Sequence, residues 1–291
     1  MPTPPDRFRA LLARPGLLVL PAVWDGLSAR LVAEAGFGAA FLSGSCVAAS
    51  RLGGPDLDLV SFAEMADSLA MARGAAPDLA ILADGDHGYG NAMNVARTVR
   101  AYGRAGAAAV LIEDKITPRA LTASGKPCLP REEARMKVRA AVEAARESGI
   151  LVMARTDCRP TLGLDEALAR IRAFVEEGAD LLFLDSPADH EELRRAVEAA
   201  GRPSFAVLSP GGAPRAVPTR TEAEALGVKL ATYPTALLGP VVGAMRSGLA
   251  ALAAGEAEAS SVAIPSSAEL RAALGYEAYE REARRYATPP G

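Results

Sequence analysis

One pattern recurs along the chain: a helix-like stretch, a glycine, and then a short apolar run that ends in polar or acidic residues. It starts at Glu34, Arg104, Glu147 and Glu176, and more weakly at Ala225. Glycine suits the left-handed position that ends a helix, and an uninterrupted apolar run is typical of a strand covered on both faces. Each occurrence therefore predicts a helix that leads into a buried parallel strand.

Eight apolar runs predict eight strands, at 17–20, 39–42, 79–83, 108–112, 150–154, 181–184, 204–208 and 228–231. The segments between them have helical periodicity. Val95 and Val99 share one helix face, and so do Leu168 and Ile171, with Asp165 expected to cap the second helix. Eight strands that alternate with helices favour a (β/α)8 barrel of the α/β class, and a doubly wound open sheet is the alternative.

Three segments interrupt this alternation. Residues 43–61 and 114–130 are longer than the usual strand-to-helix loop of about 2–6 residues, so we expect them to form active-site lids. The third segment, 260–291, predicts a C-terminal helical extension, with a helix over 268–286 that packs on a neighbouring subunit. Residues 1–259 are then the catalytic barrel.

The composition is that of a soluble globular protein, since half of the 291 residues are hydrophobic and 23% are charged. The formal net charge of −3, with no basic block, argues against nucleic acid as a partner. The most apolar later segment is interrupted by Gly239, Pro240 and Arg246 and makes a poor membrane span. Three distant cysteines and a polar N-terminus favour a reducing compartment, so we expect a cytoplasmic enzyme or binding protein with no membrane partner.

Acidic residues follow the predicted strands at the end where a parallel barrel carries its active site. Asp84 and Asp86 follow the third strand, and strand alternation directs them to the same side. Glu113 ends the fourth strand. Such an oxygen-rich cluster suits Mg²⁺ or Mn²⁺ rather than zinc. The alternative is that these acids cap helices or pair with arginines on the rim.

Other residues at the strand ends are candidates for binding a substrate. Arg155 offers a guanidinium fork for a substrate carboxylate, with an ion pair to Glu113 as the alternative. Ser43, Gly44 and Ser45 offer hydroxyls and backbone N–H groups to an anion, although such a segment is also ordinary loop sequence. His87 is a candidate for proton transfer, or for a structural hydrogen bond.

Aromatic and acidic residues after the first and eighth strands are expected to line the pocket. These are Trp24 and Asp25 after the first strand and Tyr233 after the eighth, and packing is the alternative for each. The second histidine, His190, lies among glutamates and arginines and is expected at the surface.

Five motifs resemble the isocitrate lyase/phosphoenolpyruvate mutase superfamily over nearly the whole chain. They are LSGS at 42–45, GGPD at 53–56, ADGDHGYGNAMNVARTV at 83–99, IEDK at 112–115 and ARTD at 154–157. The resemblance implies a (β/α)8 barrel that exchanges its last helix between subunits, in a homo-oligomer that is a dimer of dimers. It also implies Mg²⁺ and a 2-oxo acid or another enolate-forming substrate.

The resemblance also assigns roles to individual residues by motif position. Asp84 binds the metal directly, and the acids that hold its waters are Asp86, Glu113 and Asp56. Arg155 and the segment 43–45 bind the substrate carboxylate.

The segment after the fourth strand distinguishes branches of the superfamily. Isocitrate and methylisocitrate lyases carry a KKCGH-like motif there, whose cysteine donates a proton. This chain reads EDKITPRALT, with Leu121 near that position, and Cys128 lies seven residues later between two prolines. The DHGYGN motif looks most like the oxaloacetate decarboxylase branch, whereas EDK followed by Pro118 and Arg119 is similar to the phosphonomutases.

We therefore expect a Mg²⁺-dependent lyase that cleaves the bond at C3 of a 2-oxo acid through an enolpyruvate intermediate, similar to oxaloacetate decarboxylase. One alternative is a phosphonopyruvate or carboxyphosphonoenolpyruvate mutase or hydrolase that uses Lys115, Arg119 or Lys126 against a phosphoryl group. A second is a C–C lyase acting on 2-methylisocitrate or dimethylmalate. A third is a barrel that only binds a ligand.

Overall fold

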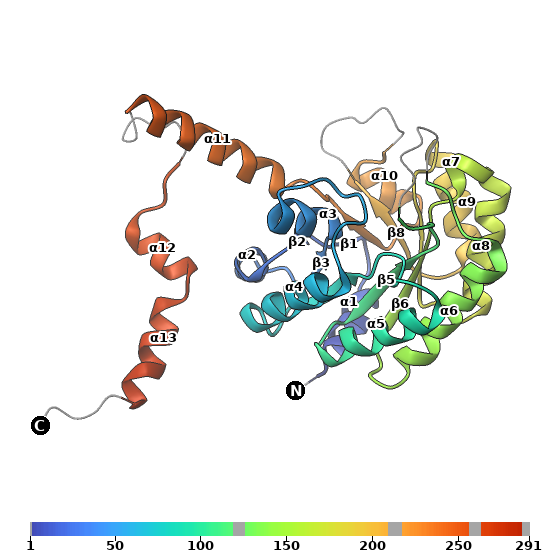
Figure 1. Cartoon of the computed structure of the whole chain (residues 1–291), viewed down its shortest axis with the longest axis horizontal. Helices are drawn as coiled ribbons and strands as arrows, with labels where there is room; N and C mark the ends of the chain where they lie inside the picture. The colour runs from blue at the N-terminus through green and yellow to red at the C-terminus, as the bar shows by residue number, and fades with distance from the viewer. Residues whose placement is uncertain (1, 119–125, 209–216, 256–262, 287–291) are drawn as a thin grey trace, which may run out of the picture. The chain divides into compact units, whose positions relative to one another are not determined.

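The chain divides into two compact units, residues 1–237 and 238–291. The computed structural model describes residues 2–118, 126–208, 217–255 and 263–286 (Figure 1). The division lies earlier than the predicted boundary at residue 259. The reason is helix α11 (Leu238–Ala254), which is apolar but carries no buried residue in the described part of the chain.

In the described residues, nine parallel strands form one sheet in the order β1-β9-β8-β7-β6-β5-β4-β3-β2. They are β1 (Leu18–Val19), β2 (Ala22–Val23), β3 (Ala39–Leu42), β4 (Ala80–Asp84), β5 (Ala109–Glu113), β6 (Leu151–Thr156), β7 (Leu181–Leu184), β8 (Ser204–Val207) and β9 (Leu230–Thr232). β1 pairs with β9 and β2 with β3, and two residues separate β1 from β2, so the edges of the sheet meet. The predicted (β/α)8 barrel is confirmed, and the open sheet is wrong.

The first predicted strand, 17–20, is present as β1, and a further short strand, β2, which the sequence analysis did not predict, follows Pro21. The Leu20 N–H donates to the carbonyl of Ala231 in β9, and the Pro21 carbonyl accepts from the N–H of Phe41 in β3. Proline has no N–H, so hydrogen bonding to β9 stops there and the chain continues along β3. The other seven predicted strands are present, with ends that shift by at most two residues.

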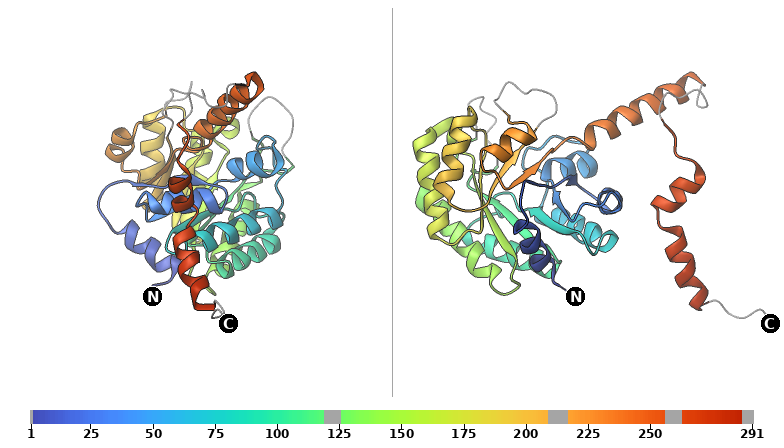
Figure 2. Two further views of the ribbon diagram at one scale, coloured as in Figure 1. Left: turned by 90° about the vertical axis from the view of Figure 1, so that its left-hand side faces the viewer. Right: turned by 180° about the vertical axis from the view of Figure 1, so that it is seen from behind.

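Helices cover the outside of the sheet in the first unit (Figure 2). They are α2 (Gly26–Glu34), α4 (Phe62–Ala75), α5 (Ala92–Arg104), α6 (Arg131–Ala145), α8 (Leu164–Glu176), α9 (His190–Ala200) and α10 (Arg220–Ala225). The helices predicted around Val95 and Leu168 are confirmed as α5 and α8. The predicted cap Asp165 is wrong, because Gly163 both ends α7 (Arg159–Leu162) and caps α8, which leaves Asp165 inside the first turn.

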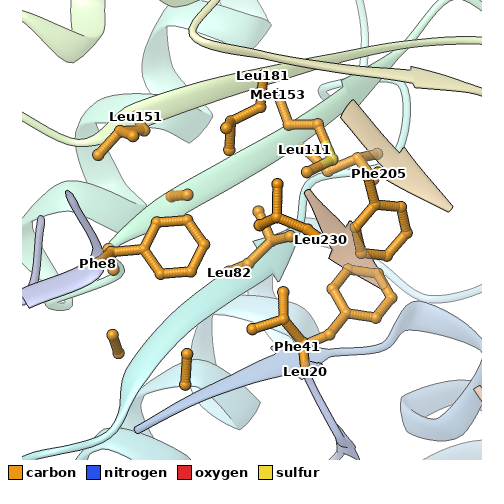
Figure 3. Packing of buried hydrophobic residues seen from close by; sticks show 14 of the residues in the cluster. Phe8, Leu20, Phe41, Leu82, Leu111, Leu151, Met153, Leu181, Phe205 and Leu230 are labelled. Carbon is orange, nitrogen blue, oxygen red and sulfur yellow. The ribbon is translucent and has the colours of Figure 1, made fainter. Parts of the chain in front are cut away.

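The barrel interior is a packed apolar core rather than a channel (Figure 3). Phe8 of α1 (Pro4–Leu12) is fully buried in this core together with Leu151 at the start of β6. Phe205 contacts the rings of Phe41 and Phe183, with centroids 5.8 and 4.9 Å away. Since α1 packs at the strand starts, the carboxyl ends of the strands are left for chemistry.

The two predicted lid segments differ in structure. Residues 43–61 contain the short helix α3 (Gly44–Val47) and a π-helix (Ala48–Leu52). In the segment 114–130, Lys115 and Cys128 form an isolated antiparallel bridge. Residues 119–125, with Arg119 and Leu121, lie outside the described residues.

The second unit is helical, but the helix expected over 268–286 is divided at Gly275, which has a left-handed φ of 76°. After α11 this unit contains α12 (Ser267–Ala273), α13 (Tyr276–Ala283) and a 3-10 turn (Arg284–Tyr286). Among the described residues, no helix has both the length and the apolar character needed to span a membrane.

Candidate active site

The loop after β4 holds the two aspartates of the DGD motif in a tight turn. A Cβ added to Gly85 would lie 2.6 Å from the carbonyl oxygen of Leu111, so glycine is required there. Asp86 follows with a left-handed φ of 46°. Asp84 Oδ1 accepts from the Asp86 N–H at 3.1 Å, and its Oδ2 accepts from the Gly44 N–H at 3.2 Å. The turn, rather than strand alternation, therefore brings Asp84 and Asp86 together.

Lys115 lies at the centre of the acidic cluster. Its Nζ is 2.7 Å from Asp58 Oδ1 and 3.5 Å from Asp86 Oδ1, and it also pairs with Glu113 Oε1. Asp58 was missed by the sequence analysis, which selected Asp56. The Asp58 side chain is 4% exposed, whereas Asp56 is an exposed residue. No periodicity separated the two aspartates, because residues 56–58 lie in a bend in which Asp58 has a left-handed φ of 61°.

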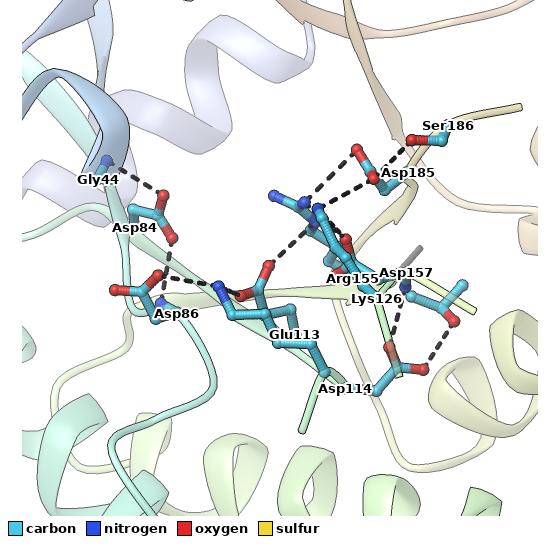
Figure 4. A network of polar contacts seen from close by, with 12 residues as sticks. Gly44, Asp84, Asp86, Glu113, Asp114, Lys126, Arg155, Asp157, Asp185 and Ser186 are labelled. Carbon is cyan, nitrogen blue, oxygen red and sulfur yellow. Dashed lines mark hydrogen bonds and ion pairs between the residues drawn. The ribbon is translucent and has the colours of Figure 1, made fainter. Parts of the chain in front are cut away.

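Arg155 lies in a group of carboxylates on the other side of Glu113 (Figure 4). Its guanidinium is 3.2 Å from Glu113 Oε2, 2.7 Å from Asp157 Oδ1 and 3.4 Å from Asp185 Oδ1. Lys126 pairs with Asp157 at 2.5 Å and with Asp185 at 3.1 Å. Arg155 therefore forms the ion pair with Glu113 that the sequence analysis gave as its alternative role. Substrate binding by Arg155 stays a prediction.

The same environment shifts the pKa values of the acids in opposite directions. Burial, together with the charge of Glu113, raises the pKa of Asp84 to about 6. Burial and the charge of Asp84 raise the pKa of Asp86 well above its usual range. Burial also acts to raise the pKa of Glu113, but the charges of Arg155 and Lys115 outweigh it and lower this pKa. An ionised Asp84–Asp86 pair therefore needs additional positive charge.

His87 is neutral at physiological pH. Burial and the nearby charge of Lys137 lower its pKa to about 4. Its buried Nδ1 has no hydrogen-bond partner among the residues that the structure describes. The sequence analysis gave a structural hydrogen bond as the alternative role of His87. Nδ1 makes no such bond with the described residues. His190, expected at the surface, is half-buried as the first residue of α9.

The remaining predicted substrate contacts have structural partners of their own. The Gly44 N–H is used by Asp84, and the hydroxyls of Ser43 and Ser45 lie 2.9 Å apart. Asp25 caps α2, where its Oδ1 accepts from the Ser28 N–H at 2.7 Å. Trp24 is 9% exposed, and Tyr233 packs against an apolar cluster that includes Leu17 and Ala231. Trp24 and Tyr233 thus pack against the protein, and Asp25 caps a helix. Their contact with a substrate stays a prediction.

A second set of charges lies behind the site, on the side of the helices. Asp114 accepts hydrogen bonds from the Thr156 hydroxyl at 2.7 Å, the Asp157 N–H at 2.9 Å and Arg170 Nη1 at 2.9 Å. Arg170 also pairs with Glu166 at 2.8 Å. These contacts fix the loop after β6, which carries Asp157.

The donor set fits a hard divalent cation. The acids of this network outnumber its cations, because Lys115 contacts three carboxylates and Arg155 contacts Glu113 together with Asp157 and Asp185. Asp58 Oδ2 is buried without a hydrogen bond from any described residue. In the described residues, no three His, Cys, Asp or Glu side chains are close enough to hold a metal directly. The set therefore fits an ion held by few carboxylates and by water.

A small pocket opens beside Asp185 at the carboxyl ends of β7 and β8. Its lining is mainly apolar and includes Phe183, Leu193 and Val207, with Asp185 and Ser186 as the polar members. Asp185 thus lies both in the wall of this apolar pocket and in the group of charges around Arg155.

The family model named phosphoenolpyruvate phosphomutase matches residues 8–253 of the chain. The chain belongs to this family. The predicted membership of the isocitrate lyase/phosphoenolpyruvate mutase superfamily is thereby confirmed, and a solved structure described as a member of that superfamily has a TM-score of 0.88. The chain is an enzyme of this superfamily, whose characterised members include lyases and decarboxylases.

Several relatives are similar over most of the chain. A 2,3-dimethylmalate lyase from Eubacterium barkeri is 38% identical over 79% of both chains. An oxaloacetate decarboxylase from Paraburkholderia xenovorans (strain LB400) is 39% identical over 72% of this chain and 69% of its own. Oxaloacetate acetylhydrolase bound to 3,3-difluorooxalacetate has a TM-score of 0.89 at 32% identity over 99% of both chains. Phosphonopyruvate hydrolase with oxalate and Mg²⁺ has a TM-score of 0.86 at 29% identity over 98% and 99%.

Proposed function

We propose that this enzyme is a Mg²⁺-dependent lyase that cleaves the bond at C3 of a 2-oxo acid, with oxaloacetate as the leading substrate. The carboxylate cluster of Asp84, Asp86 and Glu113, in which burial and mutual repulsion raise the pKa of Asp84 and Asp86, is the observation that carries the proposal. The relatives named oxaloacetate decarboxylase and oxaloacetate acetylhydrolase support this choice of substrate.

The proposed roles follow from the positions of the side chains. Asp84 would hold the metal directly, and the acids that would hold its waters are Asp86, Glu113, Asp56 and, from its position beside Lys115, Asp58. When bound, Mg²⁺, or Mn²⁺ in its place, polarises the 2-oxo group and stabilises the enolate that forms as the bond breaks. These acids keep that charge at the carboxyl ends of β4 and β5.

The substrate carboxylate would be bound on the opposite side of Glu113. Arg155 would supply the guanidinium, which Asp157 and Asp185 hold in place through Nη2. The hydroxyls of Ser43 and Ser45 provide further donors at the end of β3. His87 is neutral, so its ring can donate or accept one proton at a substrate oxygen.

The proton-donating cysteine of the lyase branch has no equivalent in this proposal. Burial, with the charges of Asp114 and Asp157, raises the pKa of Cys128, so its thiol stays protonated and unreactive. We expect Cys128→Ser to change kcat by less than about threefold on the true substrate, because no step uses the sulfur. A loss greater than about 100-fold in steady-state kinetics would contradict this prediction and return the enzyme to the lyase branch.

The apolar pocket beside Asp185 favours a second candidate, a substrate with an alkyl substituent such as 2,3-dimethylmalate. The relative named 2,3-dimethylmalate lyase supports it. The phosphoryl alternative has less support, because Lys115 and Lys126 both pair with buried or half-buried carboxylates.

The test is a pyruvate-release assay with Mg²⁺ on oxaloacetate, 2,3-dimethylmalate, 2-methylisocitrate and phosphonopyruvate, each corrected for its spontaneous rate. Pyruvate from oxaloacetate alone is the expected result. Release from dimethylmalate would select the second candidate, and phosphate with pyruvate from phosphonopyruvate would overturn C–C cleavage. The assay is repeated with EDTA, which should abolish turnover.

We also propose that the enzyme is a cytoplasmic dimer of dimers whose second unit packs on another subunit. α11 presents Val241, Val242, Met245, Leu249 and Leu252 to solvent, and such a surface normally marks a contact. The three cysteines, all within the described ranges, are free thiols, as a reducing compartment requires. Light scattering coupled to size exclusion measures the mass, and a monomer would contradict the proposal.

A further inference from the structure

Two tyrosine hydroxyls contact the DGD turn from the side facing α5. The Tyr89 hydroxyl donates to Asp86 Oδ2 at 3.2 Å, and the Tyr102 hydroxyl donates to the main-chain carbonyl of Asp84 at 3.2 Å. The two hydroxyls lie 3.3 Å apart. The Tyr89 hydroxyl therefore contacts a carboxylate, whereas the hydrogen bonds of the Tyr102 hydroxyl within the described residues go to the backbone of the turn and to the other hydroxyl.

The position of Tyr89 is unusual for its residue type. It lies between Gly88 and Gly90 with a φ of 60°, a left-handed conformation that costs an L-residue about 1–2 kcal/mol. Its ring is held by Phe62, whose ring is edge-on to it with the centroids 5.8 Å apart. Such strain persists where surrounding contacts impose it, and it is concentrated at functional sites.

The chemistry of the contact assigns the direction of the hydrogen bonds. Each tyrosine hydroxyl carries one proton, and each lies within hydrogen-bond distance of an oxygen acceptor in the DGD turn. Two protons serve three contacts. The Asp84 carbonyl and an ionised Asp86 carboxylate can only accept, so each of them receives one proton. The Tyr89 proton is therefore committed to Asp86, and it fixes the rotation of a carboxylate that otherwise contacts only Lys115 at 3.5 Å among the ion pairs of the described residues.

We propose that Tyr89 is a positioning residue that orients the Asp86 carboxylate for the divalent cation. The inference rests on the proposed Mg²⁺ site. Hydrogen bonds to metal-site side chains commonly contribute about 10- to 100-fold to metal affinity, because they remove the need to reorient the side chain on binding. Tyr89 itself touches neither substrate nor metal, so its effect passes through Asp86.

The test compares Tyr89→Phe with Tyr102→Phe, which removes a hydroxyl from a fully buried ring whose hydroxyl contacts no carboxylate. Mg²⁺ affinity is measured by isothermal titration calorimetry, and the melting temperature is measured in EDTA. We expect Tyr89→Phe to weaken Mg²⁺ binding about 10-fold with little change in melting temperature. Tyr102→Phe should lower the melting temperature and change the affinity less than about threefold, and the exposed Tyr279→Phe should change neither.

A double-mutant cycle with Asp86→Ala tests whether Tyr89 acts through Asp86. In that background, Tyr89→Phe should have no further effect on Mg²⁺ affinity. The inference is overturned if Tyr89→Phe binds Mg²⁺ as the wild type does, if Tyr102→Phe weakens binding equally, or if the effect persists without Asp86. If the proposed Mg²⁺ site itself is wrong, the result is different, because Asp84→Ala would then bind Mg²⁺ like the wild type.

Discussion

Replacing Asp84 with alanine is expected to abolish Mg²⁺-dependent turnover, by at least about 10³-fold, while the protein stays folded. Asp84 is the proposed direct ligand, and its loss removes the side chain on which the metal position depends. Stability is preserved because two effects oppose each other. The substitution removes a buried acid that is repelled by Glu113, and it leaves the N–H groups of Gly44 and Asp86 without their acceptor.

Turnover, Mg²⁺ affinity by calorimetry and melting temperature in EDTA together check this prediction. The matched control is Asp78→Ala, which removes an acid that is 84% exposed and pairs with Arg7 at the surface. It should retain wild-type activity. An Asp84→Ala enzyme with undiminished Mg²⁺-dependent turnover would remove the metal assignment, and an unfolded one would show that the turn depends on the carboxylate.

The largest effect on stability is expected for Arg170→Met, at about 3–5 kcal/mol of the free energy of unfolding. Arg170 is 2% exposed, and its partner Asp114 is equally buried. Removing the guanidinium leaves a buried carboxylate without its cation, and burial already raises the pKa of Asp114. The loop after β6 is held by the same carboxylate, so Asp157 and the partners of Arg155 should become mobile together.

Urea unfolding measures the loss, and two variants define its origin. Arg194→Met breaks an exposed pair with Glu191 and Glu198 and should leave stability unchanged. Adding Asp114→Asn to Arg170→Met should restore part of the stability, because no buried charge then remains unpaired. If Arg170→Met alone changes the free energy of unfolding by less than about 1 kcal/mol, water reaches Asp114 and the prediction is wrong.

Local sequence patterns were sufficient for the architecture. Each apolar run from 39–42 to 228–231 encodes a buried strand, because period and length distinguish it from the helices, and each glycine after a helix marks where that helix ends. The acids Asp84, Asp86 and Glu113 could be placed at the carboxyl ends of neighbouring strands for the same reason. The cap Asp25 was also readable locally, since Ser28 completes its capping box three residues later.

The partners of the charged groups depended on the tertiary structure. Arg170 pairs with Asp114, 56 residues away, and Lys126 pairs with Asp185, 59 residues away, and no periodicity connects such positions. The same holds for Asp58, which approaches Lys115 only after the segment following β3 folds over β5. Tyr89 was hidden within a recognised motif, because its contact with Asp86 needs a left-handed backbone. Periodicity records which face of an element is buried, whereas the identity of an ionic partner follows from which strand ends the closed barrel brings together.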